Sequence, residues 1–456
     1  MRVSHRFSAV FDDPNLVSCG GLAPVLALAQ RAGLHDLVAQ RVKLDARGGA
    51  NPSLKIPALV AGMVAGADSI EDMDLLRHGG MDRLFGGVRA PSTLGTFLRT
   101  FTFGHVRQLD AVAAELLSNL ARRSPLLVGA DQVAYLDVDD TVKATYGYAK
   151  QGVGYGYSGV KGLNALIATV STPLAAPVIV ATRLRKGSTN SARGAASLVA
   201  AALVTARNAG ATGLRIGRAD SAFYNHEVIA AAQRGGARFS VTARQDRSVM
   251  RAIGSIEAAA WTPIRYPNAI WDDQEQRWIS EAEVAEIDYT AFTSRRQAEH
   301  ITGRLIVRRV RRLCPGTKTG QRELFAAYRH HAVFTNSPLR ILDAEKAHRA
   351  HAIIEQVHAD LKGGPLAHLP SGSFTANSAW LVCAAIAFNL TRAAGCLASA
   401  FHAKANTATI RTQLISVPAR LANSARRLTM HLPQAWPWQQ AWQQLLAGAL
   451  PAPPPI

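Results

Sequence analysis

Three acidic residues close a short apolar segment of the chain, Leu136-Asp137-Val138-Asp139-Asp140-Thr141. The segment predicts a buried strand, and because side chains alternate along a strand, Asp137 and Asp139 share one face while Asp140 turns to the other. Two carboxylates buried side by side are unfavourable unless a proton or a cation offsets their charge. The spacing therefore indicates a divalent metal site or phosphoryl chemistry, with a solvated strand end as the alternative.

A fourth acid, Asp220, follows a predicted strand at 214–219. It stands at the carboxyl end of that strand, where open α/β sheets usually bind their ligands. If the two strands are neighbours, Asp139 and Asp220 meet at this edge. An isolated Asp before a helix is also a common N-cap, and that alternative stays open.

Glu355 is the third candidate, on a helix predicted from Asp343 to about Lys362. Helical spacing places it on one stripe with three histidines and a lysine, namely His348, His351, His358 and Lys362. Such a stripe fits a carboxylate brought to a metal among bases that reach phosphates. A zinc site made of the histidines and a merely solvated polar face are the alternatives.

The elements that must position these acids follow from the hydrophobic pattern of residues 126–245. The pattern predicts strands at 134–139, 164–170 and 178–184, a helix at 191–208, a strand at 214–219, a helix at 227–233 and a strand at 238–242. Three strands joined by short turns, then helix, strand, helix and strand, predict an α/β fold with one mixed sheet. The order is that of the ribonuclease H fold.

Four other segments surround this first part of the core. We expect a helical N-terminal DNA-binding module at 1–125, including one helix at 93–117, and a β-rich insertion at 246–340. The last part of the core, at 341–402, carries the Glu355 helix. A basic, Trp-containing C-terminal tail follows at 403–456.

The charge balance suggests a polyanionic partner. The 456 residues include 51 Lys and Arg against 32 Asp and Glu, a net charge of +19, with a pI near 10.4. Arginines number 41 of the 51; their planar fork suits phosphate, although a GC-rich genome gives the same bias. The stretch 304–335 has eight Lys or Arg and one Glu, which favours phosphate contact over a solvated face.

The cellular compartment is predicted from three features that the sequence does not show. The four cysteines have no C-x-x-C spacing, the N-terminus has no apolar leader segment, and no stretch reads as a membrane span. We therefore expect a cytoplasmic protein. One glycine-rich motif, Gly154-Tyr155-Gly156-Tyr157-Ser158-Gly159, neither directly follows a strand nor opens a helix, so it predicts a Gly/Tyr loop near the metal site rather than a dinucleotide site.

The chain resembles bacterial insertion-sequence transposases with a DDE triad, most closely the IS-thirteen-eighty group of the broad IS-four superfamily. The resemblance covers nearly the whole chain, and its stretches follow the family order. They are LDVDDT with GYAKQGVGYGYSGVKGLNAL, RKGSTNSARGA, IGRADSAFYN with GGARFSVTAR, HRAHAIIEQVHADLK with LPSGSFTANSAWL, and PARLANSARRLTMHLPQAWPW.

The resemblance implies a ribonuclease H-like core interrupted by a β-rich insertion, and a triad of Asp139, Asp220 and Glu355 that binds two Mg²⁺ ions, with Mn²⁺ as a substitute. The implied reaction is in-line phosphoryl transfer that cuts the element's ends and joins them to target DNA. The implied partners are double-stranded DNA, at the terminal inverted repeats and the target, and a second copy in a homodimeric synaptic complex. No membrane is involved, and the protein would associate with the nucleoid.

Related transposases carry a Tyr-x-x-Arg-x-x-x-Glu-x-x-x-x-x-x-Lys signature. Glu355 and Lys362 keep this spacing, but His348 and His351 stand at the Tyr and Arg positions. We expect DNA contacts from Lys362 and from His351 as a phosphate donor. Further contacts are expected from Arg193, Arg308, Arg309, Arg311 and Trp278, the last by stacking on an extruded base, with core packing as its alternative.

Two rival functions remain from the residues. An apolar strand followed by Asp-x-Asp-x-Thr also opens the motif of haloacid-dehalogenase-like phosphatases, with Asp137 as nucleophile and Asp139 as acid and base. The single Asp220 after the fourth strand and the +19 charge argue against it. The other rival is a catalytically inactive DNA-binding remnant of a mobile element.

Overall fold

The computed structural model of the chain describes residues 6, 8–44, 46–146, 150–264, 270–272, 277–279, 282–311, 328–424 and 427–450. The chain forms two compact units. Unit 1 combines residues 1–126, 142–163 and 358–456, and unit 2 combines residues 127–141 and 164–357. The candidate acids Asp139, Asp220 and Glu355 all belong to unit 2.

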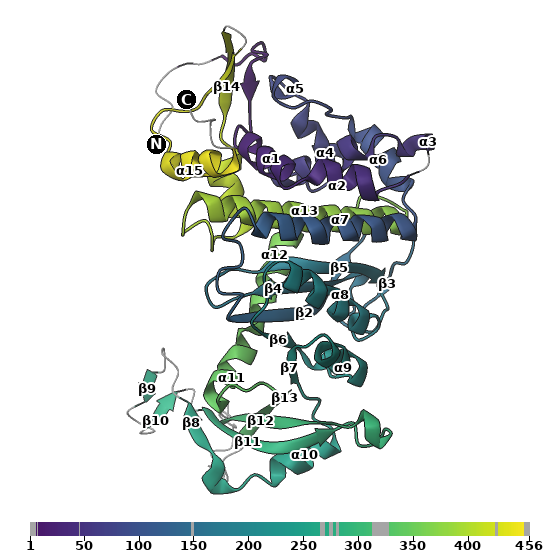
Figure 1. Ribbon diagram of the computed structural model, residues 1–456, viewed down its shortest axis with the longest axis vertical. Coiled ribbons are helices and arrows are strands. Elements are labelled where there is room, and N and C mark those ends of the chain that lie inside the picture. The colour runs from purple at the N-terminus through teal and green to yellow at the C-terminus, as the bar shows by residue number, and fades with distance from the viewer. Residues whose placement is uncertain are drawn as a thin grey trace. The chain divides into compact units, whose positions relative to one another are not determined.

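A mixed sheet forms the framework of unit 2 (Figure 1). Its central strand β2 pairs in parallel with β6, and β6 pairs in parallel with β7. The order through this part of the sheet is β5-β4-β2-β6-β7. The strands are β2 Val133–Ala144, β4 Lys161–Ser171, β5 Val178–Lys186, β6 Leu214–Ala219 and β7 Arg238–Thr242. All five strands predicted from the pattern are confirmed, as is the mixed α/β fold.

Two helices pack on this part of the sheet. Helix α8 (Ala195–Asn208) contacts β5, and α9 (His226–Arg234) contacts β7 and α8. Leu198, Ala202 and Leu203 of α8 are buried, so its apolar stripe faces the protein. The predicted helices are confirmed, although α8 begins four residues later than expected.

The predicted β-rich segment extends the same sheet. Strand β13 pairs antiparallel with β7 through Val333 and Thr242, and β12, β11 and β8 follow in order. Val284, Ile306 and Val333 pack against Ala344 in a small core of their own. The elements here are α10 Arg247–Gly254, η3 Ala258–Ala260, β8 Thr262–Ile264, β9 Ile270–Asp272, β10 Arg277–Ile279, β11 Ala282–Ala291, η4 Gln297–Glu299, β12 Ile301–Arg311 and β13 Tyr328–Thr335.

The helix predicted at 343–362 is not continuous. It consists of α11 (Ile341–Arg349), a 3₁₀ turn η5 (Ala350–Ala352) and α12 (Ile353–Lys362). A 3₁₀ turn has 3.0 residues per turn, so it shifts the phase of the side chains that follow. The predicted stripe is therefore wrong in part, because His358, which was expected on the polar face, is buried.

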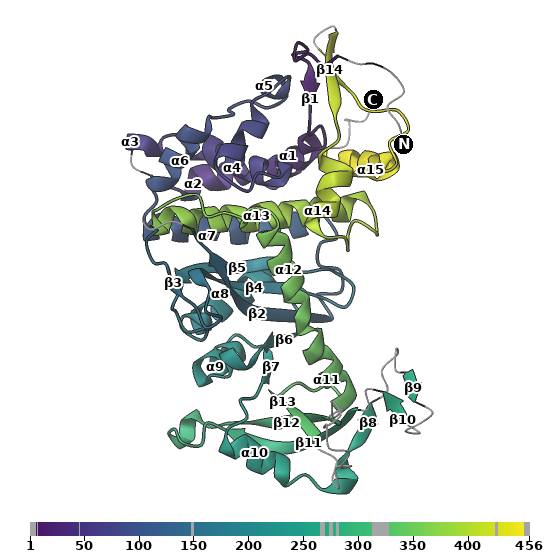
Figure 2. The same cartoon turned by 180° about the vertical axis from the view of Figure 1, so that it is seen from behind.

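Unit 1 is mainly helical. Its long helix α13 (Phe374–Ala398) lies alongside α7 (Phe103–Ala121) and also contacts α4 (Pro52–Ala65) and α15 (Gln439–Ala449) (Figures 1 and 2). By length and composition α13 could cross a membrane, but 89% of its most apolar stretch is buried inside the protein. It therefore packs as a core helix.

One feature of unit 1 differs from the pattern. The single helix predicted at 93–117 is wrong, because α6 (Pro91–Arg99) ends and Thr102 begins α7 with a capping box that it shares with His105. In the described part of the C-terminal segment, β14 (Ala419–Ser424) pairs with β1 (Leu16–Val17) and β15 (Arg427–His431). The other elements outside the sheet of unit 2 are β1 Leu16–Val17, α1 Leu22–Arg31, α2 Leu34–Arg41, α3 Ala46–Gly49, α4 Pro52–Ala65, η1 Glu71–Leu76, α5 Met81–Leu84, β3 Gly154–Tyr155, α14 Thr407–Ile410, η6 Arg411–Ile415, β15 Arg427–His431 and α15 Gln439–Ala449.

Candidate active site

Asp137 of β2 is neutralised by the protein itself. Its side chain is fully buried, and the Arg218 guanidinium donates to both carboxylate oxygens at 2.7 and 2.6 Å. The Nδ1 atom of His351 lies 2.9 Å from the same carboxylate. Burial alone would raise the pKa of Asp137, but Arg218 and His351 hold it below its ordinary value. The cation predicted to offset this acid is therefore an arginine.

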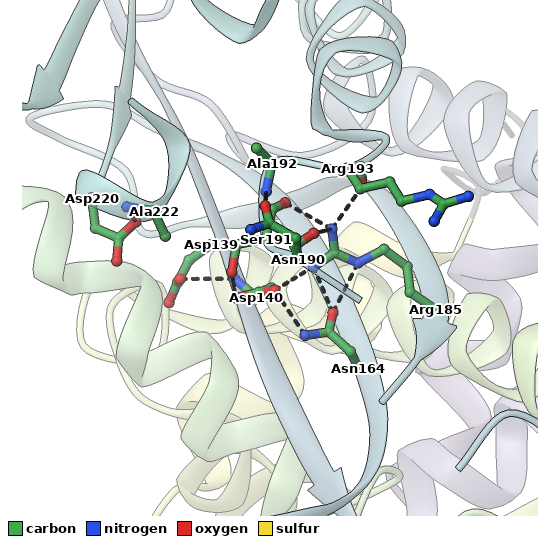
Figure 3. Close-up of polar contacts among 10 residues, drawn as sticks. All are labelled: Asp139, Asp140, Asn164, Arg185, Asn190, Ser191, Ala192, Arg193, Asp220 and Ala222. Carbon is green, nitrogen blue, oxygen red and sulfur yellow. Dashed lines mark hydrogen bonds and ion pairs between the residues drawn. The ribbon is translucent and has the colours of Figure 1, made fainter. Parts of the chain in front are cut away.

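Asp140 is also neutralised, and its side chain turns away from that of Asp139 to the other side of β2 (Figure 3). Its carboxylate pairs with Arg185 of β5 and accepts hydrogen bonds from Asn164 Nδ2 at 2.7 Å and Ser191 Oγ at 3.1 Å. The side chains of Asp140 and Arg185 are almost fully buried. The prediction that Asp140 turns to the face opposite Asp139 is confirmed.

Arg185 in turn fixes the loop between β5 and α8, residues 187–194, which we name the serine loop. Its guanidinium donates to the carbonyl oxygens of Asn190, Ser191 and Arg193 at 3.3, 2.7 and 2.8 Å. It also donates to Asn164 Oδ1 at 2.9 and 2.7 Å. One buried side chain thus joins the loop to three strands of the sheet.

Asp139 stands between these two neutralised acids. It is half-buried, and the backbone N–H of Asp140 donates to its Oδ1 at 2.7 Å. Burial raises the pKa of Asp139 to about 7; the Asp140 N–H acts against this shift, while the negative charge of Asp220 adds to it. Asp139 is thus an acid whose charged form the protein disfavours.

Asp220 faces Asp139 from the end of β6 (Figure 3). One of its oxygens accepts from the backbone N–H of Ala222 at 2.9 Å and caps the short helix η2 (Ser221–Phe223). The alternative that Asp220 is an N-cap is therefore confirmed, and capping uses one carboxylate oxygen. Asp220 is exposed, yet desolvation by the surrounding protein raises its pKa, and the charge of Asp140 adds to the shift.

The carboxylate pair of Asp139 and Asp220 fits a divalent cation. Two acids that raise each other's energy when ionised gain most from a positive ion, and carboxylate oxygens are the ligands that Mg²⁺ and Mn²⁺ prefer. Within the described part of the chain, no three His, Cys, Asp or Glu side chains form a ready metal cluster. The pair is thus an incomplete ligand set.

Glu355 lies in the first turn of α12 with an exposed side chain. Among the described residues, Glu355 does not form a metal-binding cluster with Asp139 and Asp220. Its place in the triad therefore stays a prediction. The His351 ring, 2.9 Å from Asp137, lies close enough to the pair that a positive charge on it would lower the pKa of Asp139 and of Asp220.

His348 points away from the predicted outward stripe. It lies 3.0 Å from Ser240 Oγ and 2.9 Å from Thr242 Oγ1 of β7. Burial lowers its pKa to about 3, and the nearby His351 adds to this shift. The ring is neutral at physiological pH and holds α11 to the sheet.

The residues predicted to contact DNA have different surroundings. Lys362 and Arg193 are exposed, and the Arg193 side chain extends away from the Asp140 network (Figure 3). Arg308 lies 3.6 Å from Glu345, while Arg309 pairs with Glu283 at 2.6 Å and stacks on Trp261 and Tyr328. Arg311 and Trp278 lie in β12 and β10, but their side chains are outside the described part. Their contacts with DNA stay predictions.

Sequence reasoning missed the two arginines that neutralise the site. Arg218 lies in β6, two residues before Asp220, and Arg185 lies near the end of β5. An arginine within an apolar strand next to predicted buried acids is a usable signal, because a buried cation needs a carboxylate partner.

The phosphatase alternative has no support from this geometry. A nucleophilic aspartate must reach its substrate, whereas Asp137 is 0% exposed and both of its oxygens are bound by Arg218. Attack from this position would first require breaking a buried ion pair.

A comparison of the chain with known protein families identifies its family. The model of one family, described as transposase DDE domain group 1, matches residues 3–451. No protein of curated function matches the chain. Since the family match spans nearly the full length and includes both facing carboxylates, the chain belongs to the transposase DDE domain group 1 family.

Proposed function

We propose that the chain is an insertion-sequence transposase of the IS-thirteen-eighty group, which cuts the terminal inverted repeats of its element and joins the ends to target DNA. The observation that carries this proposal is the facing pair of Asp139 and Asp220, with the pKa of both acids raised. Such a pair is typical of a site made to bind cations where phosphoryl groups react.

The sheet supports the proposal of a ribonuclease H-like core. The order β5-β4-β2-β6-β7, with β2, β6 and β7 parallel, is the order expected for that fold. The two facing acids come from the neighbouring parallel strands β2 and β6, and Asp139 and Asp220 directly follow the last paired residues, Val138 and Ala219.

In this proposal Glu355 completes the triad, and the three carboxylates hold the ions. Two Mg²⁺ ions, or Mn²⁺ in their place, would activate the attacking oxygen and stabilise the leaving oxygen. The chain's own groups prepare this centre: the Asp140 N–H orients Asp139, while Arg218 and Asp137 fix the ring of His351. His351 and Lys362 then donate to DNA phosphates.

The proposed substrates are double-stranded DNA at the element's ends and at the target. We propose a homodimer as the synaptic form, because two ends must be joined in one event. The protein would act on the nucleoid in the cytoplasm. The net charge of +19 supports binding to a polyanion.

The test is strand cleavage of a duplex that carries the inverted repeats flanking the gene, in Mg²⁺ and in EDTA. Wild type should nick and join these ends only with the metal. Asp139→Asn, Asp220→Asn and Glu355→Gln should each lower the rate by at least about 10³-fold, as expected for loss of several kcal/mol of charge stabilisation. Asp288→Asn, an exposed acid on β11 of the same unit, is the matched control.

Full activity of Glu355→Gln would remove that residue from the triad. A folded wild type that binds the ends but never cuts them would instead indicate an inactive element remnant.

A further inference from the structure

The Gly/Tyr motif of the sequence forms a well-defined hairpin in unit 1, residues 150–163, which we name the tyrosine hairpin. Strand β3 pairs with the start of β4 through Tyr155 and Lys161. The Gly156 N–H donates to the Val160 carbonyl at 3.0 Å, and the Gly159 N–H donates to the Gly156 carbonyl at 3.0 Å. Gly159 has φ +73°, which suits the last position of a three-residue hairpin loop. Tyr157 and Ser158 therefore stand at the tip.

The base of the tyrosine hairpin is anchored to the segment before α13. The Gln151 N–H donates to the Gly372 carbonyl at 2.9 Å, and Gln151 Oε1 accepts from the Phe374 N–H at 3.1 Å. Gly152 has φ +81°, and a Cβ there would lie 2.9 Å from the Phe374 ring. Both features require glycine at this position, so the hairpin is held in place at its base while its tip faces solvent.

Three tyrosine rings of this region are exposed. The exposed fractions are 67% for Tyr155, 81% for Tyr157 and 86% for Tyr146, which precedes the hairpin. A tyrosine ring left in water forgoes the burial that makes aromatic residues stabilising. Two of them, Tyr155 and Tyr157, lie on one anchored hairpin, which indicates a binding surface rather than scattered exposure.

The charge of the segment that contains the hairpin favours one kind of partner. Residues 142–163 of unit 1 contain three Lys and no Asp or Glu, and Lys161 is exposed opposite Tyr155 in the pairing of β3 and β4. Lysine favours a phosphate backbone, and the flat faces of tyrosine stack on bases. In an intact duplex those base faces are covered by their neighbours. The combination therefore fits nucleotides that are unpaired.

We propose that the tyrosine hairpin binds unpaired nucleotides of the DNA substrate, with Tyr155 and Tyr157 stacking on bases and Lys161 contacting the backbone. The proposal rests on the proposed function only in requiring that the chain act on DNA. It assigns to unit 1 a surface for unpaired nucleotides of the substrate.

The experiment compares three probes by fluorescence anisotropy with the full chain: a 20-nucleotide oligo-dT, a 20-base-pair duplex, and the same duplex with a three-nucleotide internal gap. The variants are Tyr155→Ala, Tyr157→Ala and the corresponding Phe substitutions. Phe401→Ala, an exposed ring of unit 1 outside the hairpin, is the matched control. Melting temperatures show whether each variant is folded.

Each Ala variant should weaken binding of oligo-dT and of the gapped duplex by roughly tenfold, within the range measured for base–aromatic stacking. Both Phe variants and Phe401→Ala should bind as wild type, and intact-duplex binding should change less than about twofold. Unchanged oligo-dT binding by folded Ala variants would overturn the proposal. Equal losses for duplex and oligo-dT would also overturn it, since they indicate a charge or folding effect.

The outcome separates this proposal from the proposed function. If wild type binds and cleaves DNA while the Ala variants bind every probe normally, only the hairpin assignment fails. If the wild type binds no DNA at all, the function fails with it. Light scattering of the DNA-free protein tests a third outcome. If the Ala variants bind DNA normally but have a lower molar mass than wild type, the hairpin is a protein interface and the proposal is overturned.

Discussion

At the scale of single residues, the site depends on how three adjacent acids of one strand are treated. Asp137 and Asp140 are buried against Arg218 and Arg185, whereas Asp139 is left beside another carboxylate. The two neutralised acids stabilise the fold and orient their neighbours. Asp139 carries an unfavourable charge that a cation relieves, so its chemistry and its cost to stability have the same origin.

We predict that Asp139→Asn stabilises the metal-free protein at neutral pH. The pKa of Asp139 is raised to about 7 in the folded state, whereas an unfolded aspartate titrates at about 3.9. The acid therefore costs no stability below about pH 4, and the cost grows as the pH rises to about 7. The melting temperature in EDTA should rise in the variant at pH 7.5 and match wild type at pH 4. Identical pH profiles for the two proteins would contradict this assignment.

We predict the opposite effect for Asp137→Asn. The Arg218 guanidinium would lose its buried carboxylate, and removing one partner of a buried ion pair costs about 3–5 kcal/mol. Because the folded protein lowers the pKa of Asp137, the ionised carboxylate stabilises the fold at any pH above the ordinary pKa of an aspartate. This stabilisation is lost as the pH falls from there through the lowered pKa. Urea denaturation measures the loss, and Asp137→Asn with Arg218→Met should recover part of it. A loss under about 1 kcal/mol would show that the pair contributes little.

At the scale of elements, the serine loop has its conformation set by one arginine. Arg185→Lys keeps a positive charge opposite Asp140 but cannot donate to Asn164 and three carbonyls together. We predict faster amide hydrogen exchange in residues 187–194 with little change in α9. Arg207→Lys, an exposed arginine of α8, should leave exchange unchanged. Loop exchange equal to wild type in Arg185→Lys would show that other contacts hold the loop.

Most elements of the sheet could be predicted from the sequence, since the apolar runs of β6 and β7 coincide with the observed strands. The ends of the helices were harder to predict from the sequence. The break before α7 depends on a capping box between Thr102 and His105, and the 3₁₀ turn at 350–352 has no proline or glycine to mark it. A 3.6-residue period runs through both places unchanged, so pattern alone predicts continuous helices.

The candidate site was predictable only in part. Asp139 and Asp220 were identified because each follows an apolar run, and the parallel pairing of β2 with β6 brings them together, although β2 itself continues to Ala144. The pairing of Asp140 with Arg185 joins residues 45 positions apart in different strands, and that choice of partner depends on the folded sheet. The local pattern therefore could not show which of the three acids the protein neutralises.

At the scale of the whole molecule, the net charge of +19 sets how binding responds to salt. Each phosphate neutralised releases counterions, so the logarithm of affinity falls with the logarithm of salt concentration by about 0.9 per contact. We predict that affinity for a 20-base-pair duplex falls at least about 10³-fold between 50 and 200 mM salt, which corresponds to about six contacts. Fluorescence anisotropy over this range measures it. A loss under tenfold would indicate that the excess charge faces something other than DNA.

The most direct test of the central claim is a titration of the full chain with Mn²⁺ at pH 7.5, with free Mn²⁺ followed by electron paramagnetic resonance. If Asp139 and Asp220 form the metal centre, wild type and Asp288→Asn should bind Mn²⁺ saturably and alike. Asp139→Asn and Asp220→Asn should each weaken the affinity at least about tenfold, because each removes a carboxylate ligand. Wild-type affinity in both folded variants would contradict the claim that this pair holds the ion.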